Sequence, residues 1–129
     1  MALLKSRKAY KKKISLGNVK SSRDWGHAKD FVNAMWLMLQ QDNPDDYIIG
    51  TGQKHTVEDF ANTAFSHVGL NYKDHIELDK DLVRSVESDN RVADSSKAKK
   101  ILEWRPGFSF EDLVYDMVES DLRSLSDSQ

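Results

Sequence analysis

Cysteine is absent from the 129 residues, and proline occurs only twice. The absence of cysteine excludes a disulfide scaffold, a cysteine-ligated zinc site and a cysteine nucleophile, and it fits a reducing compartment. No apolar run approaches the roughly 18 residues that a membrane-spanning helix needs, so we expect no membrane partner. The apolar part of the N-terminus is too short for a secretory signal, and we therefore expect a cytoplasmic protein.

The composition that remains is that of an ordinary water-soluble protein, and the length suits one domain or part of a larger one. The net charge of −2 hides an uneven distribution, because residues 1–23 carry no acid and residues 110–129 carry six acids against Arg123 alone. This asymmetry fits either a nucleic-acid-binding arm built on Lys5–Lys13 or two solvated ends. The second interpretation is favoured because Tyr10 is the only aromatic residue in the basic run, so no nucleic-acid partner is expected.

Hydrophobic periodicity predicts one strong helix in the first half of the chain. Its apolar positions recur at the spacing of a single helical face, and Asn43-Pro44 ends it because the residue before proline disfavours the helical region. These positions are Ala28, Phe31, Val32, Met35, Met38 and Leu39. Short strands are predicted on either side, at Lys13–Val19 and at Tyr47–Gly50, and the second has the apolar character of a buried strand.

Local signals predict three more helices. Thr56 and Asp59 have the spacing of a capping box, and Gly69 supplies a left-handed stop to the helix that follows. Asp94 is predicted to cap a short helix with Ala98, Ile101 and Leu102 inward. Ser109–Asp112 opens the last helix, which turns Leu113, Val114, Met117, Val118 and Leu122 inward. Residues 71–93 show no clear periodicity. A strand such as Tyr47–Gly50 cannot form a sheet alone, which suggests a piece of something larger.

No catalytic constellation follows from the residues themselves. The chain has no Gly-x-Gly-x-x-Gly or phosphate loop, and its four histidines show no convincing metal-ligand spacing. Two arginines in non-periodic surroundings, Arg23 and Arg84, remain candidates for binding phosphate or carboxylate, because the planar guanidinium suits bidentate contacts. The alternative for each is a surface salt bridge.

One block of sequence is more specific than any of these signals. Residues 23–30 read Arg-Asp-Trp-Gly-His-Ala-Lys-Asp, and the block resembles the GDP-mannose 4,6-dehydratase family of extended short-chain dehydrogenases. The resemblance continues through most of the chain, at residues 34–41, 44–47, 84–89, 97–99, 104–106 and 110–118. It implies an α/β fragment, the C-terminal substrate-binding portion of an extended short-chain dehydrogenase Rossmann fold, mostly helical with two or three short strands.

The family resemblance also implies a reaction. A family member is a hydro-lyase: NADP takes a hydride from C4 of GDP-mannose, water leaves across C5 and C6, and the hydride returns to C6. By this comparison residues 1–129 are the substrate-binding part, and the NADP-binding Rossmann core is missing together with the catalytic Thr, Glu, Tyr and Lys. We therefore expect no catalytic, cofactor-binding or metal residue in this chain, and no activity from the chain alone.

The same resemblance assigns three substrate-binding residues. Arg23 and Arg84 are implied to contact the pyrophosphate of GDP, and Glu87 to accept a hydrogen bond from a ribose hydroxyl. Ser85 and Val86 stand where the family has proline and threonine. The expected partners are GDP-mannose and either a missing N-terminal half or further copies of the chain. The alternative is a non-enzymatic remnant that binds sugar nucleotides or serves as an interaction module.

Overall fold

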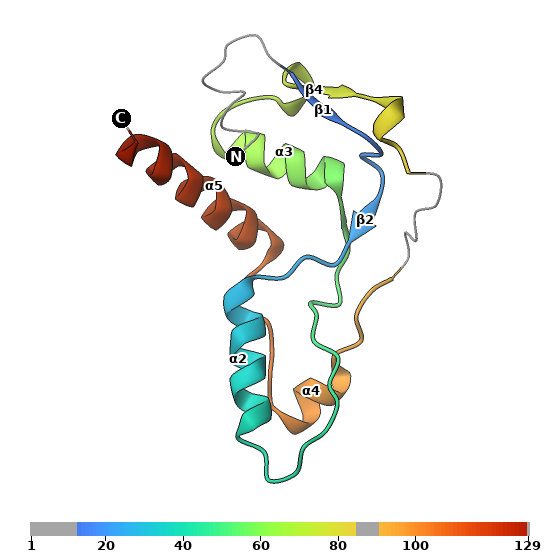
Figure 1. The fold of residues 1–129 in the computed structure, drawn as a ribbon, viewed down its shortest axis with the longest axis vertical. Helices are drawn as coiled ribbons and strands as arrows, with labels where there is room; N and C mark the ends of the chain where they lie inside the picture. The colour runs from blue at the N-terminus through green and yellow to red at the C-terminus, as the bar shows by residue number, and fades with distance from the viewer. Residues whose placement is uncertain (1–12, 85–90, 129) are drawn as a thin grey trace. The chain divides into compact units, whose positions relative to one another are not determined.

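The computed structural model describes residues 13–84 and 91–128 (Figure 1). The chain divides into two compact units, which are described separately. The first contains residues 13–21, 56–84 and 114–128, and the second contains residues 22–55 and 91–113. Within these described ranges, no helix is both long and apolar enough to cross a membrane.

A parallel strand pair lies in the first unit. Strand β1 (Ile14–Leu16) pairs with β4 (Ile76–Leu78), with Ile14 opposite Ile76 and Leu16 opposite Leu78. The strand predicted at Lys13–Val19 is thus confirmed. The sequence did not predict β4, because three residues carry too little periodicity. Two short 3-10 helices, η1 (Tyr72–Asp74) and η2 (Lys80–Leu82), flank β4.

The hydrophobic part of the first unit involves two helices. Helix α3 (Val57–His67) begins at the predicted capping box, in which Thr56 accepts from the Asp59 amide and Asp59 accepts from the Thr56 amide. Gly69 follows with a φ of 72°, as its predicted role as a left-handed stop requires. The fully or nearly buried side chains come from α3 and from α5 (Phe110–Asp127): Ala61, Ala64, Phe65, Val114 and Val118. Met117 on α5 was predicted to be inward, but it is 51% exposed.

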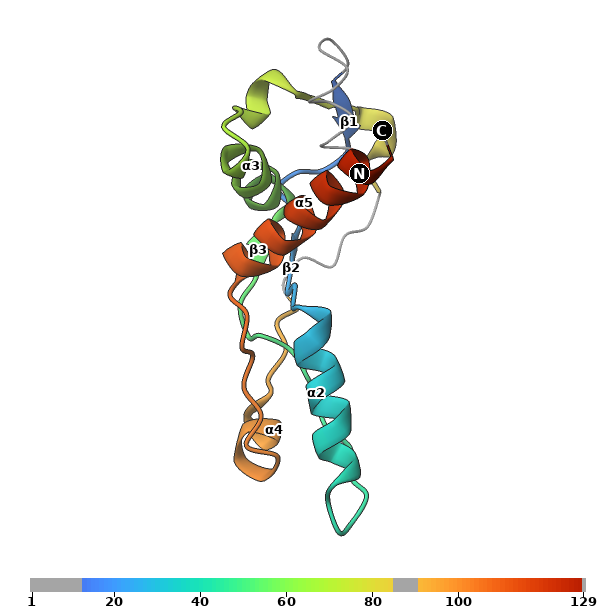
Figure 2. The same cartoon turned by 90° about the vertical axis from the view of Figure 1, so that its left-hand side faces the viewer.

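The second unit is built around α2 (Ala28–Leu39) and α4 (Ser96–Ile101), which lie side by side in Figures 1 and 2. Their core consists of Ala34, Ala98, Leu102 and Trp104. The Trp104 indole donates to the Asp30 carbonyl at 2.9 Å, and the Asp30 carboxylate accepts from the amides of Gly107 and Phe108. A buried carboxylate needs hydrogen-bond donors, and these amides supply them, so the Asp30 side chain can be buried. The cap of α4 is displaced by one residue: the helix follows Ser95, and Asp94 still accepts from the Ser96 amide.

The predicted strand at Tyr47–Gly50 is wrong. No other described strand lies beside this segment, so its extended backbone belongs to neither sheet. Side-chain contacts hold it instead. Tyr47 and Ile49 pack against the α2–α4 core, and the Ser95 hydroxyl donates to the Gly50 carbonyl at 2.7 Å. An apolar, β-prone sequence forms a strand only where a partner completes its hydrogen bonds.

Candidate functional site

Arg23 lies on strand β2 (Ser22–Arg23), which pairs with β3 (His55–Thr56). Its side chain is exposed, and one guanidinium nitrogen donates to the Ser22 carbonyl at 2.7 Å. A guanidinium group carries five N–H donors in a planar fork, so an exposed arginine at this position is chemically suited to a phosphate or carboxylate ligand.

The backbone after Arg23 is fixed by the carboxylate of Asp24. Oδ1 accepts from the amide of Thr51 at 3.1 Å and from its hydroxyl, while Oδ2 accepts from the amides of Gly52 at 2.9 Å and Ala93 at 3.3 Å. A Cβ on Gly50 would lie 2.3 Å from the Cβ of Ala93, so only glycine allows this approach. We call this arrangement the Asp24 turn. It joins three segments of the second unit directly beside Arg23.

The Asp24 turn includes the segment that would be the first candidate for binding NADP, the dinucleotide that the family resemblance implies. Gly50-Thr51-Gly52 is the closest that the sequence comes to a glycine-rich loop. Its amides at Thr51 and Gly52 already donate to a carboxylate, and a negative charge at that place repels phosphate. The amides of Thr51 and Gly52 therefore do not fit the phosphates of a bound NADP.

An aromatic cavity of about 370 Å³ lies in the second unit. The rings of His55 and Phe110 stack on its wall with centroids 3.8 Å apart, and Trp25 lies 6.1 Å from Phe110. The Nε2 atom of His55 is buried without a hydrogen-bond partner among the described atoms. The one charged side chain in the lining is that of Asp112, whose pKa is lowered by hydrogen bonds from Ser109. An anion is therefore not an expected ligand of this cavity.

A second, polar cavity of about 740 Å³ lies in the first unit, between α3 and η1. Glu58 on its wall forms an ion pair with Lys20 and accepts from the Tyr72 hydroxyl at 2.5 Å. The hydrogen bonds from Lys20 and Tyr72 lower the pKa of Glu58, and the bond to this carboxylate raises the pKa of Tyr72. Lys20 is thus already engaged with an acid.

Of the other two predicted binding residues, the structure describes Arg84 but not Glu87. Arg84 follows η2 in the first unit and is exposed. Glu87 lies outside the described residues, as do residues 5–12 of the basic N-terminal run. The contacts expected of Arg84 and Glu87 with a ligand therefore stay predictions.

Two histidines make side-chain hydrogen bonds to other parts of their units. His27 caps α2 by accepting from the Lys29 amide at 3.1 Å, and its ring stacks on Phe108. His67 contacts Glu119, with Nε2 and Oε1 2.8 Å apart. No cluster of potential metal ligands occurs within residues 13–84 and 91–128.

Replacing Asp24 by alanine should destabilise the chain by about 2–4 kcal/mol, because several donors lose a charged acceptor at once. Asp24→Asn should cost less, since the amide oxygen retains one acceptor. Chemical denaturation of both variants measures the effect. Asp42→Ala, at an exposed acid just beyond α2, is the control and should leave the midpoint unchanged. Equal stability of Asp24→Ala and Asp42→Ala would contradict a structural role for the Asp24 turn.

Comparison with known proteins gives a consistent result. A family model for GDP-mannose 4,6-dehydratase matches residues 1–117. The chain is 54% identical over 110 residues to GDP-mannose 4,6 dehydratase 1 of Arabidopsis thaliana, which covers 85% of the chain and 30% of the relative. It is 41% identical over 126 residues to the GDP-mannose 4,6 dehydratase of Homo sapiens, covering 84% of the chain and 34% of the relative. The chain thus spans about a third of the length of these relatives.

Solved structures agree on the fold. The chain resembles dTDP-glucose 4,6-dehydratase of Bacillus anthracis in complex with NAD, with a TM-score of 0.82 and 20% identity over 97% of the chain and 39% of that protein. It also resembles UDP-glucose 4-epimerase of Thermotoga maritima with UDP-glucose, with a TM-score of 0.78 and 22% identity over 95% of the chain and 39% of that protein. The predicted fold class, a helix-rich portion of an extended short-chain dehydrogenase fold, is confirmed.

Proposed function

This chain belongs to the GDP-mannose 4,6-dehydratase family, and from this premise we propose that it forms the part of such an enzyme that holds the GDP end of GDP-mannose. The observation that carries the proposal is the family match over residues 1–117, which includes the block at residues 23–30. The enzyme would be a hydro-lyase, and its other part would bind NADP and supply the hydride chemistry.

The geometry around Arg23 supports this role. The residue is exposed on β2, and the backbone that follows it is held by the hydrogen bonds of the Asp24 turn. An arginine whose backbone is fixed loses less freedom when its guanidinium binds a phosphate. Two phosphates carry charge that a planar, bidentate donor neutralises well. Arg84 and Glu87 are proposed to complete the contacts, to the pyrophosphate and to a ribose hydroxyl.

The alternative, a non-enzymatic sugar-nucleotide-binding protein, also has an observation in its favour. The amides of Thr51 and Gly52 donate to Asp24, and the sequence has no Gly-x-Gly-x-x-Gly, which supports a chain that binds the sugar nucleotide without the cofactor. Both proposals predict GDP binding. They differ in whether the chain can complete an active enzyme.

A chimera distinguishes the two. This chain would replace the matching segment of GDP-mannose 4,6 dehydratase 1 of Arabidopsis thaliana, which supplies the remainder of the enzyme. We expect the chimera to convert GDP-mannose to the 4-keto-6-deoxy sugar nucleotide, because the replaced segment belongs to the same family. Product formation measured by mass spectrometry is the readout, with the intact Arabidopsis protein as the control. A chimera that melts cooperatively and binds NADP, yet forms no product, would contradict the enzymatic proposal and favour the binding protein.

A further inference from the structure

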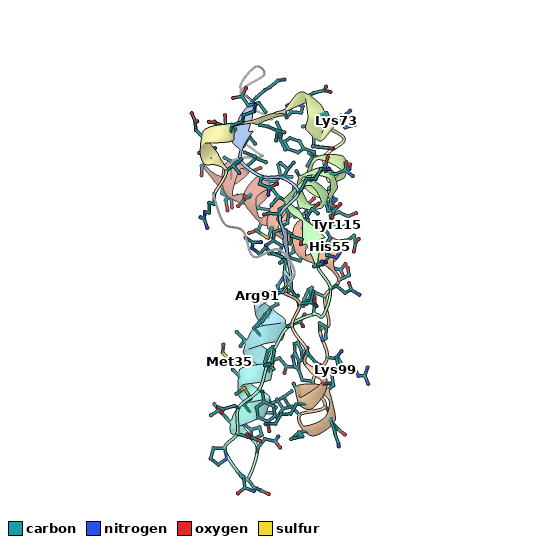
Figure 3. All side chains as sticks on the ribbon, turned by 90° about the vertical axis from the view of Figure 1, so that its right-hand side faces the viewer. Met35, His55, Lys73, Arg91, Lys99 and Tyr115 are labelled. Atoms are coloured by element: carbon teal, nitrogen blue, oxygen red, sulfur yellow. The ribbon has the colours of Figure 1, made fainter. Side chains whose placement is uncertain are left out.

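The aromatic cavity of the second unit takes no part in the contacts proposed for GDP. His55 stacks on Phe110 in its wall, with ring centroids 3.8 Å apart and an angle of 5° between the ring planes, and Trp25 lies 6.1 Å from Phe110. We call these three side chains the ring wall. Figure 3 shows His55 where β3 leads into α3. The volume of about 370 Å³ lies in the range of small-molecule sites.

The charge of the lining favours a cation. Asp112 is the one charged side chain among the described residues that line the cavity. Backbone and side-chain hydrogen bonds from Ser109 lower the pKa of Asp112, so this carboxylate is ionised at neutral pH. Helix α5 begins at the cavity with the positive end of its dipole, equivalent to roughly half a charge, but its first turn carries two acids, Glu111 and Asp112. The negative charge therefore exceeds the positive charge here.

The imidazole of His55 adds an aromatic ring to the wall and no positive charge. Its Nε2 atom is buried and has no hydrogen-bond partner among the described atoms. Protonation of both ring nitrogens would place a donor and a charge at this buried atom without an acceptor, which costs free energy. The neutral imidazole avoids this cost.

A neighbouring ring already holds a cation. Phe108 also lines the cavity, and the Lys29 ammonium lies over its ring, 5.8 Å from the centroid. His27 stacks on the same ring with centroids 3.9 Å apart. Because the chain itself supplies both partners of Phe108, a ligand would make its ring contacts with the ring wall. Cations are attracted to the faces of aromatic rings, and most strongly to that of tryptophan.

The class of cation follows from the groups that the lining offers. A metal ion needs several ligands, and no cluster of potential metal ligands occurs in the two described ranges, residues 13–84 and 91–128. A primary ammonium is strongly hydrated and has three donors to satisfy, which a single carboxylate does not do. A quaternary ammonium has no donor and presents apolar methyl groups, so aromatic rings and one carboxylate suit it.

We propose that this cavity is a binding site for a small quaternary ammonium ion, which the ring wall contacts and the charge of Asp112 attracts. The ligand is a cation, whereas GDP is an anion, so the proposal does not rest on the proposed function. Binding can be measured without GDP and without catalysis.

The test is a titration with a probe of this class. Tetramethylammonium chloride would be added to the 129-residue chain and to the chimera at constant ionic strength. The control probe is tert-butanol, an uncharged molecule of similar size and shape. NMR spectra would follow the indole N–H of Trp25 and the ring C–H groups of His55. The chain has three tryptophans, so the indole signals of Trp36 and Trp104 are internal controls.

We expect the Trp25 and His55 signals to move and to saturate, with a dissociation constant on the order of millimolar because the ligand has few atoms. The signals of Trp36 and Trp104 should not move. tert-Butanol should bind at least about tenfold more weakly, since it lacks the charge that the rings and Asp112 attract. The chain and the chimera should give similar affinities.

Two variants locate the bound ion. Trp25→Leu should weaken binding about fivefold or more, because it removes a ring and keeps an apolar side chain, and Asp112→Asn should weaken it about threefold. The matched controls are Trp36→Leu and Asp42→Asn, whose positions are exposed and outside the lining, and both should leave the affinity unchanged. A melting curve for each variant identifies those that fold. If Trp25→Leu does not fold, Asp112→Asn and the wild-type signals decide.

Several results would overturn the proposal. Unmoved Trp25 and His55 signals would show that the cavity takes no such ion. Equal affinity for tert-butanol would show that charge has no part in binding. Unchanged affinity in folded Trp25→Leu and Asp112→Asn would place the ion elsewhere. Binding to the chain but not to a folded chimera would mean that the remainder of the enzyme covers the cavity, and displacement by GDP would make the cavity part of the substrate site.

Discussion

Replacing Arg23 or Arg84 by alanine should weaken GDP binding by about 10- to 100-fold, because a charge-assisted hydrogen bond contributes roughly 1.5–3 kcal/mol. Arg→Lys at either position should recover only part of the affinity, since an ammonium group lacks the bidentate fork. Glu87→Gln should cost less than either arginine variant, because an amide oxygen still accepts from a ribose hydroxyl. Calorimetric titration of GDP into the chimera and into the 129-residue chain is the measurement.

Arg123→Ala is the matched control for these variants. Arg123 is exposed on α5 and has no proposed contact with the ligand, so its loss should leave the dissociation constant for GDP unchanged. A melting curve for each variant separates lost contacts from lost structure. If Arg23→Ala and Arg84→Ala bind GDP as the control does, both are ordinary surface arginines, and the binding roles that the family resemblance implies do not apply to this chain.

The 129-residue chain alone should form no 4-keto-6-deoxy product from GDP-mannose and NADP. The reason is chemical: the reaction needs a bound dinucleotide, the chain has no Gly-x-Gly-x-x-Gly loop, and the amides of Thr51 and Gly52 already donate to Asp24. The expected effect is complete, in contrast to the graded effect of an arginine variant. Incubation of the purified chain with both compounds, followed by mass spectrometry of the sugar nucleotides, is the assay.

Two controls accompany this assay. A mixture without protein gives the background, and the chimera gives the activity expected when the remainder of the fold is present. Product above background from the chain alone would show that its own residues bind the dinucleotide and perform the chemistry. The assignment of these roles to the remainder would then be wrong.

Most helices were predictable because their signals are local. The capping box at Thr56 and Asp59 and the one at Ser109 and Asp112 each need only four consecutive residues, and both occur in the structure. Gly69 adopts the positive φ that its residue type favours. In each of these places, the residue type and the backbone geometry depend on neighbours that are adjacent in sequence.

Features that depend on distant partners were harder to predict. Strand β4 forms because Ile76 meets Ile14, which lies far away in sequence, and three residues give no periodic signal of this pairing. The prediction of a strand at Tyr47–Gly50 was wrong because a strand also needs a partner. The sequence of this segment favours a strand, but no described strand pairs with it. For α2 the periodicity predicted the helix correctly. It did not reveal that Ala34 would be covered while Met35 would stay exposed.

In the candidate site, too, local sequence signals were predictable and contacts between distant residues were not. The choice of Arg23 and Arg84 came from isolated charges and from family resemblance, and their ligand contacts stay predictions. Sequence reasoning missed Asp24, which organises the turn beside Arg23 through four hydrogen bonds. A signal was present, because an acid between a strand and a helix, together with Gly50-Thr51-Gly52, is suited to collecting backbone amides. The residue at position 93 that completes the set could not have been identified from the sequence alone.

The Asp24 turn has a consequence for the order of folding events. Its hydrogen bonds join residues that are 27, 28 and 69 positions apart, so none can form until long loops have closed. The backbone hydrogen bonds within helices α2 and α3 join residues that are close in sequence, so these helices can begin to form earlier. Arg23 therefore obtains its final backbone conformation late, after Ala93 has reached Asp24. During synthesis this requires at least 93 residues to have left the ribosome, and a nascent chain arrested before that point would present the arginine without the structure that orients it.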